Sequence, residues 1–117
     1  MYNCIMYSKD LIKGTLQPII LKLLAEKKRM YGYEITQTVK ELTKGKIELT
    51  EGALYPMLHK LEADGILRTE KEFIGKRVRK YYTLTKTGHA VVTDKVNEFT
   101  DFLATMSLLL KPSKATT

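Results

Sequence analysis

The sequence predicts a mainly α-helical fold with a small β-hairpin and one long C-terminal helix. Apolar residues recur at helical spacing in four segments between residues 15 and 111. Residues 67–84 instead contain two runs of strand-forming residues around a glycine-containing turn. Glycine or proline follows most of the helical segments and separates one from the next.

The composition is that of an ordinary globular domain. The chain has 117 residues, of which 44% are hydrophobic and 28% charged, and this is enough for one domain with its own core. The single cysteine, Cys4, excludes an intrachain disulfide and favours a reducing cytoplasm. No apolar run reaches membrane-spanning length, and the N-terminus lacks the features of a signal peptide. We therefore expect a cytoplasmic protein without a membrane partner.

The first helical segment is predicted at residues 15–28. Thr15 can cap this helix, and Pro18 then falls in the first turn, where its missing N–H has no helical partner. Its apolar stripe consists of Leu16, Ile19, Ile20, Leu23 and Leu24.

Two further helices are predicted before the hairpin. One begins near Gly32 and stops by Gly45, with an apolar face formed by Ile35, Val39 and Leu42. The next begins at Glu51, behind Thr50 as N-cap, and ends at Gly65 in a Schellman-type close. Its buried face is formed by Leu54, Leu58 and Leu61.

The hairpin at residues 67–84 has Gly75 in its turn, and a last helix follows from Thr85 to about Lys111, where Pro112 ends it. We expect Tyr33 and Tyr82 to pack at the edge of the core. The order helix, helix, helix, hairpin, helix is that of a winged helix-turn-helix. We therefore expect a winged helix-turn-helix domain at residues 10–84 and a separate C-terminal helix at residues 85–111.

The third helical segment contains two residues that disfavour helices, Gly52 and Pro56. Both lie close to the predicted N-terminus, where few backbone hydrogen bonds are lost. The side opposite the leucines carries Gly52, Tyr55, Pro56, His59 and Ala63. This face is small and flat, and hydrogen bonds from Tyr55, His59 and nearby Lys60 suit contact with base edges in a groove. The same residues would also serve to fix the entry to a helix in a small bundle, and this stretch alone does not separate the two interpretations.

Charge is distributed unevenly along the chain, whose formal net charge is +7. Residues 71–86 hold six basic residues and one acidic residue, a net of +5, whereas residues 89–110 have a net charge of −2. Four cations gather in residues 76–80 beside the hairpin turn: Lys76, Arg77, Arg79 and Lys80. We interpret them as phosphate contacts rather than as a merely solvated strand.

Three segments carry a resemblance to a known family. They are GTLQPIILKLLAEKKRMYGYEI at residues 14–35, LTEGALYPMLHKLEADGIL at 49–67 and RKYYTLTKTGHA at 79–90. Over roughly residues 10 to 110 the chain resembles the PadR family of bacterial winged-helix transcription regulators. The single helix after the hairpin resembles the short-tailed branch of that family.

The resemblance implies that the helix carrying GALYP enters the major groove of duplex DNA and that the wing lies along the DNA backbone. It assigns the groove-facing positions to Thr50, Glu51, Gly52, Tyr55, Pro56 and His59. It assigns phosphate contacts to Lys76, Arg77, Arg79 and Lys80. Tyr31 stands where many members have histidine, and Pro18 is unusual in the first helix; neither departure touches the DNA-facing pattern.

The last helix carries a heptad seam about three heptads long: Val92, Val96, Phe99, Leu103, Met106 and Leu110. Such a stripe either folds back over the first helix or meets another chain, and the resemblance implies that both occur in a homodimer. The soft, flat groups on or beside the seam are Phe99, Phe102 and Met106. They suggest a site for a small planar aromatic effector.

Enzymatic functions find little support in the sequence. Cys4, His59 and His89 lack the spacing of zinc ligands, and no nucleophile–histidine–acid set or glycine-rich phosphate loop is present. We expect no cofactor, no bound metal and no catalytic residue. The function expected is a dimeric, ligand-responsive repressor that binds a two-fold symmetric double-stranded DNA operator. The alternatives are a winged-helix module that binds protein and one that binds RNA.

Overall fold

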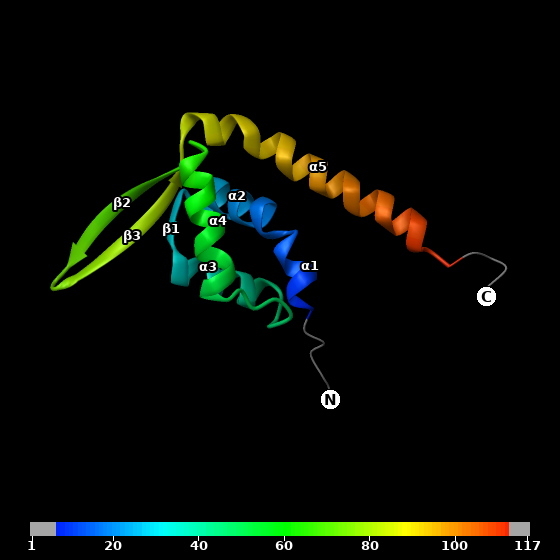
Figure 1. The fold of residues 1–117 in the computed structure, drawn as a ribbon, viewed down its shortest axis with the longest axis horizontal. Helices are drawn as coiled ribbons and strands as arrows, with labels where there is room; N and C mark the ends of the chain where they lie inside the picture. Colours follow the sequence, from blue (N-terminus) through cyan, green and yellow to red (C-terminus); the bar gives the residue numbers. More distant parts are fainter. Residues whose placement is uncertain (1–6, 113–117) are drawn as a thin grey trace.

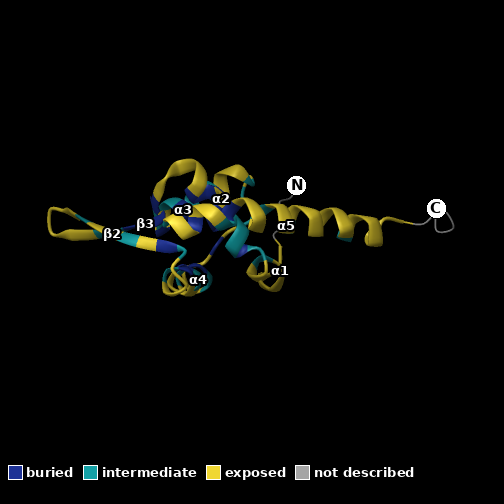
Figure 2. Cartoon of the chain, turned by 90° about the horizontal axis from the view of Figure 1, so that it is seen from above, coloured by how far each residue is buried: buried dark blue, intermediate teal, exposed yellow. Residues whose placement is uncertain are grey.

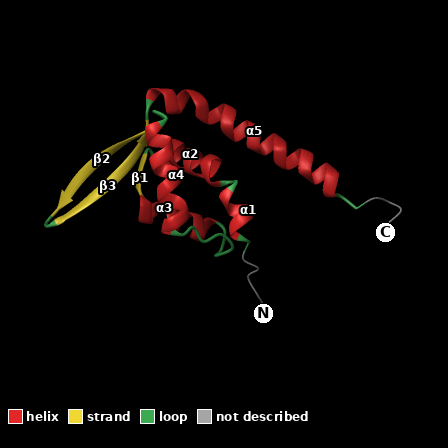
Figure 3. Cartoon of the chain, in the orientation of Figure 1, coloured by secondary structure: helices red, strands yellow, loops and turns green. Residues whose placement is uncertain are grey.

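The computed structural model describes residues 7–112, which form five helices and one three-stranded antiparallel sheet (Figures 1 and 3). In chain order the elements are α1 (Lys9–Lys13), α2 (Leu16–Lys27), β1 (Arg29–Tyr31), α3 (Gly32–Leu42), α4 (Glu51–Ala63), β2 (Leu67–Ile74), β3 (Arg77–Leu84) and α5 (Lys86–Leu110). The strand order is β1-β3-β2, so the short first strand is added to the outer edge of the hairpin. The fold is a winged helix with a long C-terminal helix, as the sequence predicted.

The ends of α4 follow the predicted capping chemistry. The Thr50 hydroxyl accepts a hydrogen bond from the Ala53 N–H at 3.2 Å, which satisfies one of the unpaired donors of the first turn. At the other end Gly65 adopts a φ of +77°, and the Ile66 N–H donates to the Leu61 carbonyl at 2.9 Å. This is the Schellman-type ending that the sequence predicted.

Two elements near the N-terminus were not predicted. Residues Lys9–Lys13 form a short helix, with Ser8 as its N-cap. Thr15 is the N-cap residue of α2, as predicted, but its hydroxyl donates to the Ile12 carbonyl of the preceding turn at 2.8 Å and makes no capping bond. Residues 29–31 form a strand because they pair with β3 residues that are distant in the sequence.

The core lies between α2, α3, α4 and the base of the hairpin. Its fully buried side chains include Ile20, Leu24, Ile35, Leu54, Leu58 and Tyr82. Two predicted core positions are wrong: Leu42 is 71% exposed and Tyr33 is 63% exposed. Leu42 is the last residue of α3, and Tyr33 lies in its first turn, so both sit at helix ends beyond the core.

The start of α5 is fixed to the end of α4. The Thr85 hydroxyl donates to the Gly65 carbonyl at 2.6 Å and accepts from the Gly88 N–H at 2.9 Å. Gly88 lies so close to the Ile66 carbonyl that a side chain at position 88 would overlap it. The first half of α5 packs along α2, whereas the second half runs out from the body of the domain and is largely exposed (Figures 1 and 2).

Candidate nucleic-acid interface

One side of α4 faces away from the core. Along it the exposed residues are Thr50, Glu51, Gly52, Pro56, His59 and Lys60, and Tyr55 is half-buried. The leucines of the same helix are fully buried on the opposite side. The fold therefore brings all seven predicted α4 residues onto one continuous surface.

Gly52 has no structural need to be glycine. It lies in the first turn of α4, its φ is not positive, and a Cβ built on it would meet no atom within 4 Å. Alanine there would favour the helix by about 1 kcal/mol. The absence of a side chain leaves the backbone of the first helical turn open to close approach by a partner.

The Tyr55 ring crosses from α4 to the first turn of α3. A Cβ at Gly32 would overlap the hydroxyl end of the ring, so this glycine makes room for the tyrosine. The His59 ring lies one turn further along α4, with 6.3 Å between the two ring centroids. Tyr55 therefore joins the exposed face of α4 to the helix before it, with its ring only partly open to solvent.

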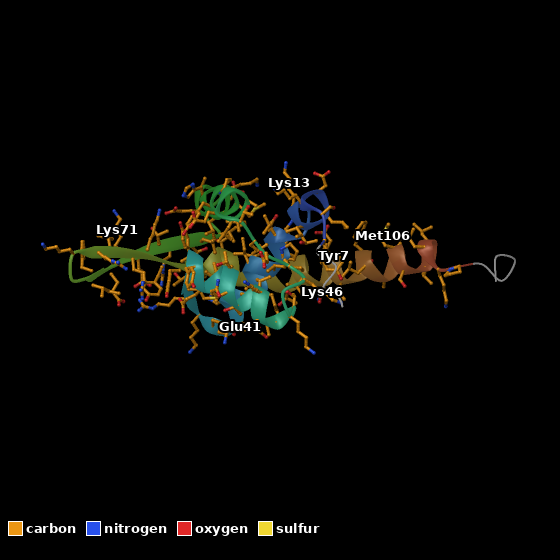
Figure 4. The ribbon with its side chains drawn as sticks, turned by 90° about the horizontal axis from the view of Figure 1, so that it is seen from below. Tyr7, Lys13, Glu41, Lys46, Lys71 and Met106 are labelled. Carbon is orange, nitrogen blue, oxygen red and sulfur yellow. The ribbon has the colours of Figure 1, made fainter. Side chains whose placement is uncertain are left out.

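The wing comprises β2, the turn at Gly75 and β3. It extends away from the helices, and Lys71 projects from it (Figures 1 and 4). Gly75 has a φ of +62°, as the tight turn requires. Lys76 and Arg77 next to the turn are exposed. They form the most accessible positive charge of the predicted phosphate-contact set.

The other two cations of that set have partners within the domain. The Arg79 guanidinium lies 4.2 Å above the centroid of the Tyr31 ring. The Lys80 ammonium lies 4.0 Å from the Glu62 carboxylate on α4. Both side chains are half-buried, so they support the wing as well as add to its charge.

Arg79 is the first of a row of stacked side chains that alternate between β3 and β1, ending at Arg29. Tyr31 and Tyr81 are cross-strand partners whose rings meet edge to face at 5.4 Å, and the Arg29 guanidinium lies 3.9 Å from the Tyr81 centroid. Arg29 also binds the Glu72 carboxylate at 2.7 Å, and this hydrogen bond raises its pKa. The row holds the wing against β1.

A basic, tyrosine-lined cleft lies between the wing and the helices. Its volume is about 400 Å³, and its lining residues are Tyr31, Gly32, Tyr33, Tyr55, Ile74, Arg77, Val78, Arg79 and Lys80. Three of these side chains are cationic and none is acidic. The cleft suits an anionic chain such as a nucleic-acid backbone.

Two residues near the site are not predicted by the sequence: Tyr33, which lines the cleft, and Arg29, which belongs to the stacked row. The sequence predicts Tyr33 at the edge of the core, but the first turn of α3, which begins at Gly32 as predicted, borders the cleft instead. Arg29 is missed because a three-residue strand carries too short a pattern to detect. The alternation of Arg29 and Tyr31 around buried Met30 is the only signal that the sequence offers.

The predicted heptad seam of α5 divides into two parts. Val92 is buried and Val96 packs against the domain's own core. Phe99 and Met106 are half-buried, whereas Leu103 and Leu110 are 52% and 74% exposed. The first part of the seam is therefore covered by the protomer itself, and the second part is open.

A smaller cavity lies where α5 crosses the start of α2. Its volume is about 350 Å³, and it is lined by Gly14, Gln17, Pro18, Lys95, Glu98, Phe99 and Phe102. The two phenylalanine rings are 6.4 Å apart and inclined by 30°. Met106, the third residue predicted for an effector site, does not line it.

Within residues 7–112 no group of three or more histidine, cysteine, aspartate or glutamate residues is arranged to hold a metal ion. None of the helices in that range is long and apolar enough to cross a membrane.

The arrangement of α3, α4 and the wing, with one bare helical face beside a basic hairpin, defines the class of winged-helix nucleic-acid-binding proteins. The PadR-like family of transcriptional regulators matches residues 20–94, and the chain belongs to this family. Family members are transcriptional regulators rather than enzymes, and they bind DNA.

Individual relatives agree with the family assignment. The transcriptional regulator Rv3488 of Mycobacterium tuberculosis is 38% identical over 65 residues, which are 56% of this chain and 58% of the relative. The structure of a transcriptional regulator from Clostridium thermocellum superposes with a TM-score of 0.78 at 28% identity and covers 91% of this chain and 100% of the other. A PadR family transcriptional regulator from Eggerthella lenta gives a TM-score of 0.72 at 29% identity, with 89% and 88% coverage.

Proposed function

We propose that this chain is a cytoplasmic transcriptional repressor that binds a two-fold symmetric operator as a homodimer and responds to a small planar aromatic effector. The observation that carries the DNA-binding part is the bare first turn of α4 at Gly52 beside the basic cleft and wing. In this proposal residues 10–84 form the DNA-binding domain and residues 85–111 form the dimerisation helix.

Contact with DNA is assigned to two surfaces. The exposed side of α4 lies in the major groove, where Tyr55, His59 and Lys60 offer hydrogen-bond donors to base edges. Lys76 and Arg77 contact phosphates, and Arg79 and Lys80 add charge to the wall of the cleft. Phosphate contacts supply affinity, whereas the α4 contacts supply sequence discrimination.

Dimerisation is assigned to the open part of the α5 seam. Leu103 and Leu110, with neighbouring Phe102 and Leu109, present apolar side chains that are each more than half exposed in the single protomer. A lone helix with such a face is stable in water when a second copy covers it. Two-fold symmetry of the dimer then requires two-fold symmetry of the operator.

The effector is assigned to the cavity between α2 and α5. Its volume of about 350 Å³ lies within the range of small-molecule sites, and the inclined Phe99 and Phe102 rings offer flat apolar surfaces. A ligand there would press on the junction of α5 with α2. Because α5 also joins the two protomers in this proposal, the ligand changes the separation of the two α4 helices, and ligand and DNA weaken each other's binding reciprocally.

The proposed DNA binding is tested by selecting duplexes from a random-sequence pool with the wild-type protein. The selected duplexes are then footprinted. We expect two inverted half-sites about 34 Å apart, one helical turn or a multiple of it. Selection of no duplex, with capture of single-stranded RNA instead, would favour the RNA-binding alternative.

The effector part is tested by titrating planar aromatic compounds against the protein–operator complex and following DNA release by fluorescence anisotropy. Compounds that release DNA from the wild type should bind Phe99→Ala at least tenfold more weakly. Undiminished binding to Phe99→Ala would place the effector site elsewhere.

A further inference from the structure

The end of the wing carries an exposed apolar pair. Phe73 on β2 and Val78 on β3 are direct cross-strand partners, and they are 74% and 53% exposed. They occupy the same face of the hairpin as Leu67 and Leu84, which are buried at its base. An apolar pair therefore recurs on the core face of the hairpin beyond the core, where it is exposed to solvent.

An aromatic ring beside a β-branched residue stabilises a hairpin, and this alone is one reason for such a pair. It does not explain the exposure. A pair of threonines would hold the strands together without presenting a phenylalanine ring to water, and Ile74 beside the turn is also 44% exposed. Phe73 and Val78 form a small apolar patch on one face of the wing end, whereas Ile74, the next residue of β2, lies on the other face.

Positive charge surrounds this patch. The pair of residues next to it on the same face is Lys71 opposite Lys80, a placement of like charges that weakens a hairpin. On the other side Lys76 lies in the turn itself, and Arg77, the first residue of β3, adds positive charge on the opposite face of the hairpin. The acidic residue that precedes Phe73 in β2, Glu72, is bound to Arg29. The end of the wing therefore combines an apolar tip with cations on both sides.

The minor groove of duplex DNA has the complementary arrangement, with sugars and base edges in its interior and a row of phosphates along each wall. We propose that Phe73 and Val78 form an apolar wedge that enters this groove and bends the duplex, while the flanking cations contact the phosphates. The inference rests on the proposed DNA-binding function and deepens it by naming the side chains that enter the groove and the deformation that they cause.

The size of the groove requires the deformation. The minor groove of regular duplex DNA is about 6 Å wide, too narrow for a two-stranded ribbon, so the side chains enter and the groove opens around them. Apolar side chains inserted this way unstack neighbouring base pairs and kink the duplex away from the protein by about 20–90°. Flexible pyrimidine–purine steps would then be preferred beneath the wing, a sequence preference that needs no hydrogen bond to the bases.

The experiment uses the full chain and a duplex selected by it from a random pool, with donor and acceptor dyes at the duplex ends. Energy transfer reports the bend, anisotropy reports the affinity, and the double variant Phe73→Thr/Val78→Thr keeps strand-forming residues in the hairpin. We expect the wild type to bend the duplex by about 20° or more. The double variant should lose most of the bend and bind about tenfold more weakly, with an unchanged salt dependence because no cation is removed.

The matched control is Leu42→Gln, which removes an apolar residue of similar exposure, 71%, from the end of α3. It should leave both bend and affinity unchanged. A double variant that bends and binds DNA like the wild type overturns the inference. So does a double variant that is monomeric in sedimentation where the wild type is a dimer, because the wing tip would then be a contact between protomers. Failure of the wild type to bind any duplex is a different outcome, because it overturns the proposed function itself.

A second measurement needs no variant and so does not depend on the folding of the hairpin. A fluorescent adenine analogue is placed in turn at each step of the selected duplex, where loss of stacking makes it brighter. Brightening at the steps beneath the wing supports the wedge. No brightening at any step, together with energy transfer equal to that of free DNA, contradicts it.

Discussion

The Tyr55 ring of α4 occupies the space that a side chain at Gly32 of α3 would fill. A side chain at position 32 would therefore displace the ring, whereas a Cβ at position 52 would meet nothing. The two glycines flank the same surface for different reasons. One positions Tyr55, and the other leaves the first turn of α4 open.

The contact between Tyr55 and Gly32 predicts a coupled pair of substitutions. Gly32→Ala forces the ring to move and should lower the free energy of unfolding by about 1–3 kcal/mol. In the Tyr55→Ala background the same change should cost much less, because the obstructing ring is gone. Chemical denaturation of the four proteins in this cycle measures the difference. Equal costs in both backgrounds would show that the ring does not occupy this space.

Gly52→Ala separates stability from binding. The added Cβ enters open space and favours the helix, so the free energy of unfolding should rise by about 0.5–1 kcal/mol. The same methyl group obstructs close approach of DNA, so affinity for a selected duplex should fall. Thermal unfolding and anisotropy measure the two effects, and Ala25→Gly at an exposed position of α2 is the reverse control for helix propensity. A more stable variant with unchanged DNA affinity would remove Gly52 from the interface.

The wing cations predict a change in salt dependence. Arg77→Ala/Arg79→Ala should weaken binding to all duplexes alike and reduce the slope of log affinity against log salt by about 0.9 for each phosphate that is no longer neutralised. Lys86→Ala/Lys95→Ala removes the same charge from α5 and should leave the slope unchanged. If both double variants lower the slope equally, the effect comes from net charge and the wing has no special role in phosphate binding.

Because the second part of the α5 seam is exposed, we expect a charged substitution at Leu103 to dissociate the dimer. Leu103→Glu places a charge in the proposed apolar contact between protomers. Burying this unpaired charge should cost several kcal/mol of association free energy. Sedimentation should then show monomer. Thr105→Glu on the same helix lies off the seam and should leave the dimer intact. A dimeric Leu103→Glu would mean that the protomers associate elsewhere or not through α5.

The burial of the Tyr82 hydroxyl leads us to expect a loss of stability at alkaline pH. Burial raises the pKa of Tyr82 above its ordinary value of 10.0, and Glu62 contributes to the shift. Above that pH the unfolded chain releases the proton more readily than the folded one, so the free energy of unfolding falls as pH rises. Tyr82→Phe should show a shallower fall than the wild type between pH values of about 10 and 11. Identical pH profiles for the two proteins would contradict this assignment.

Much of the fold could be predicted from local sequence, because its main elements carry local signals. The caps at Thr50 and Thr85, the glycine at the end of α4 and the hairpin turn at Gly75 are each specified within a few residues. Strand β1 could not be predicted this way. Its three residues become a strand only because β3 pairs with them, fifty or more positions later in the sequence.

The site shows the same division. The α4 surface follows from helical periodicity, and its seven predicted residues do lie on one side of the helix. Sequence spacing could not show that Tyr55 packs on Gly32, that Arg79 stacks on Tyr31 or that Tyr33 borders the cleft. These contacts depend on how α3 and the wing approach α4, which is a property of the folded chain.

A competition experiment tests whether α4 and the wing read the sequence of duplex DNA. A duplex selected by the wild-type protein and a shuffled duplex of the same composition compete for binding at fixed salt. We expect the protein to prefer the selected duplex by about a thousandfold or more, the range of specific DNA-binding proteins. Equal affinity for the two duplexes, or tighter binding to single strands than to either, would contradict it.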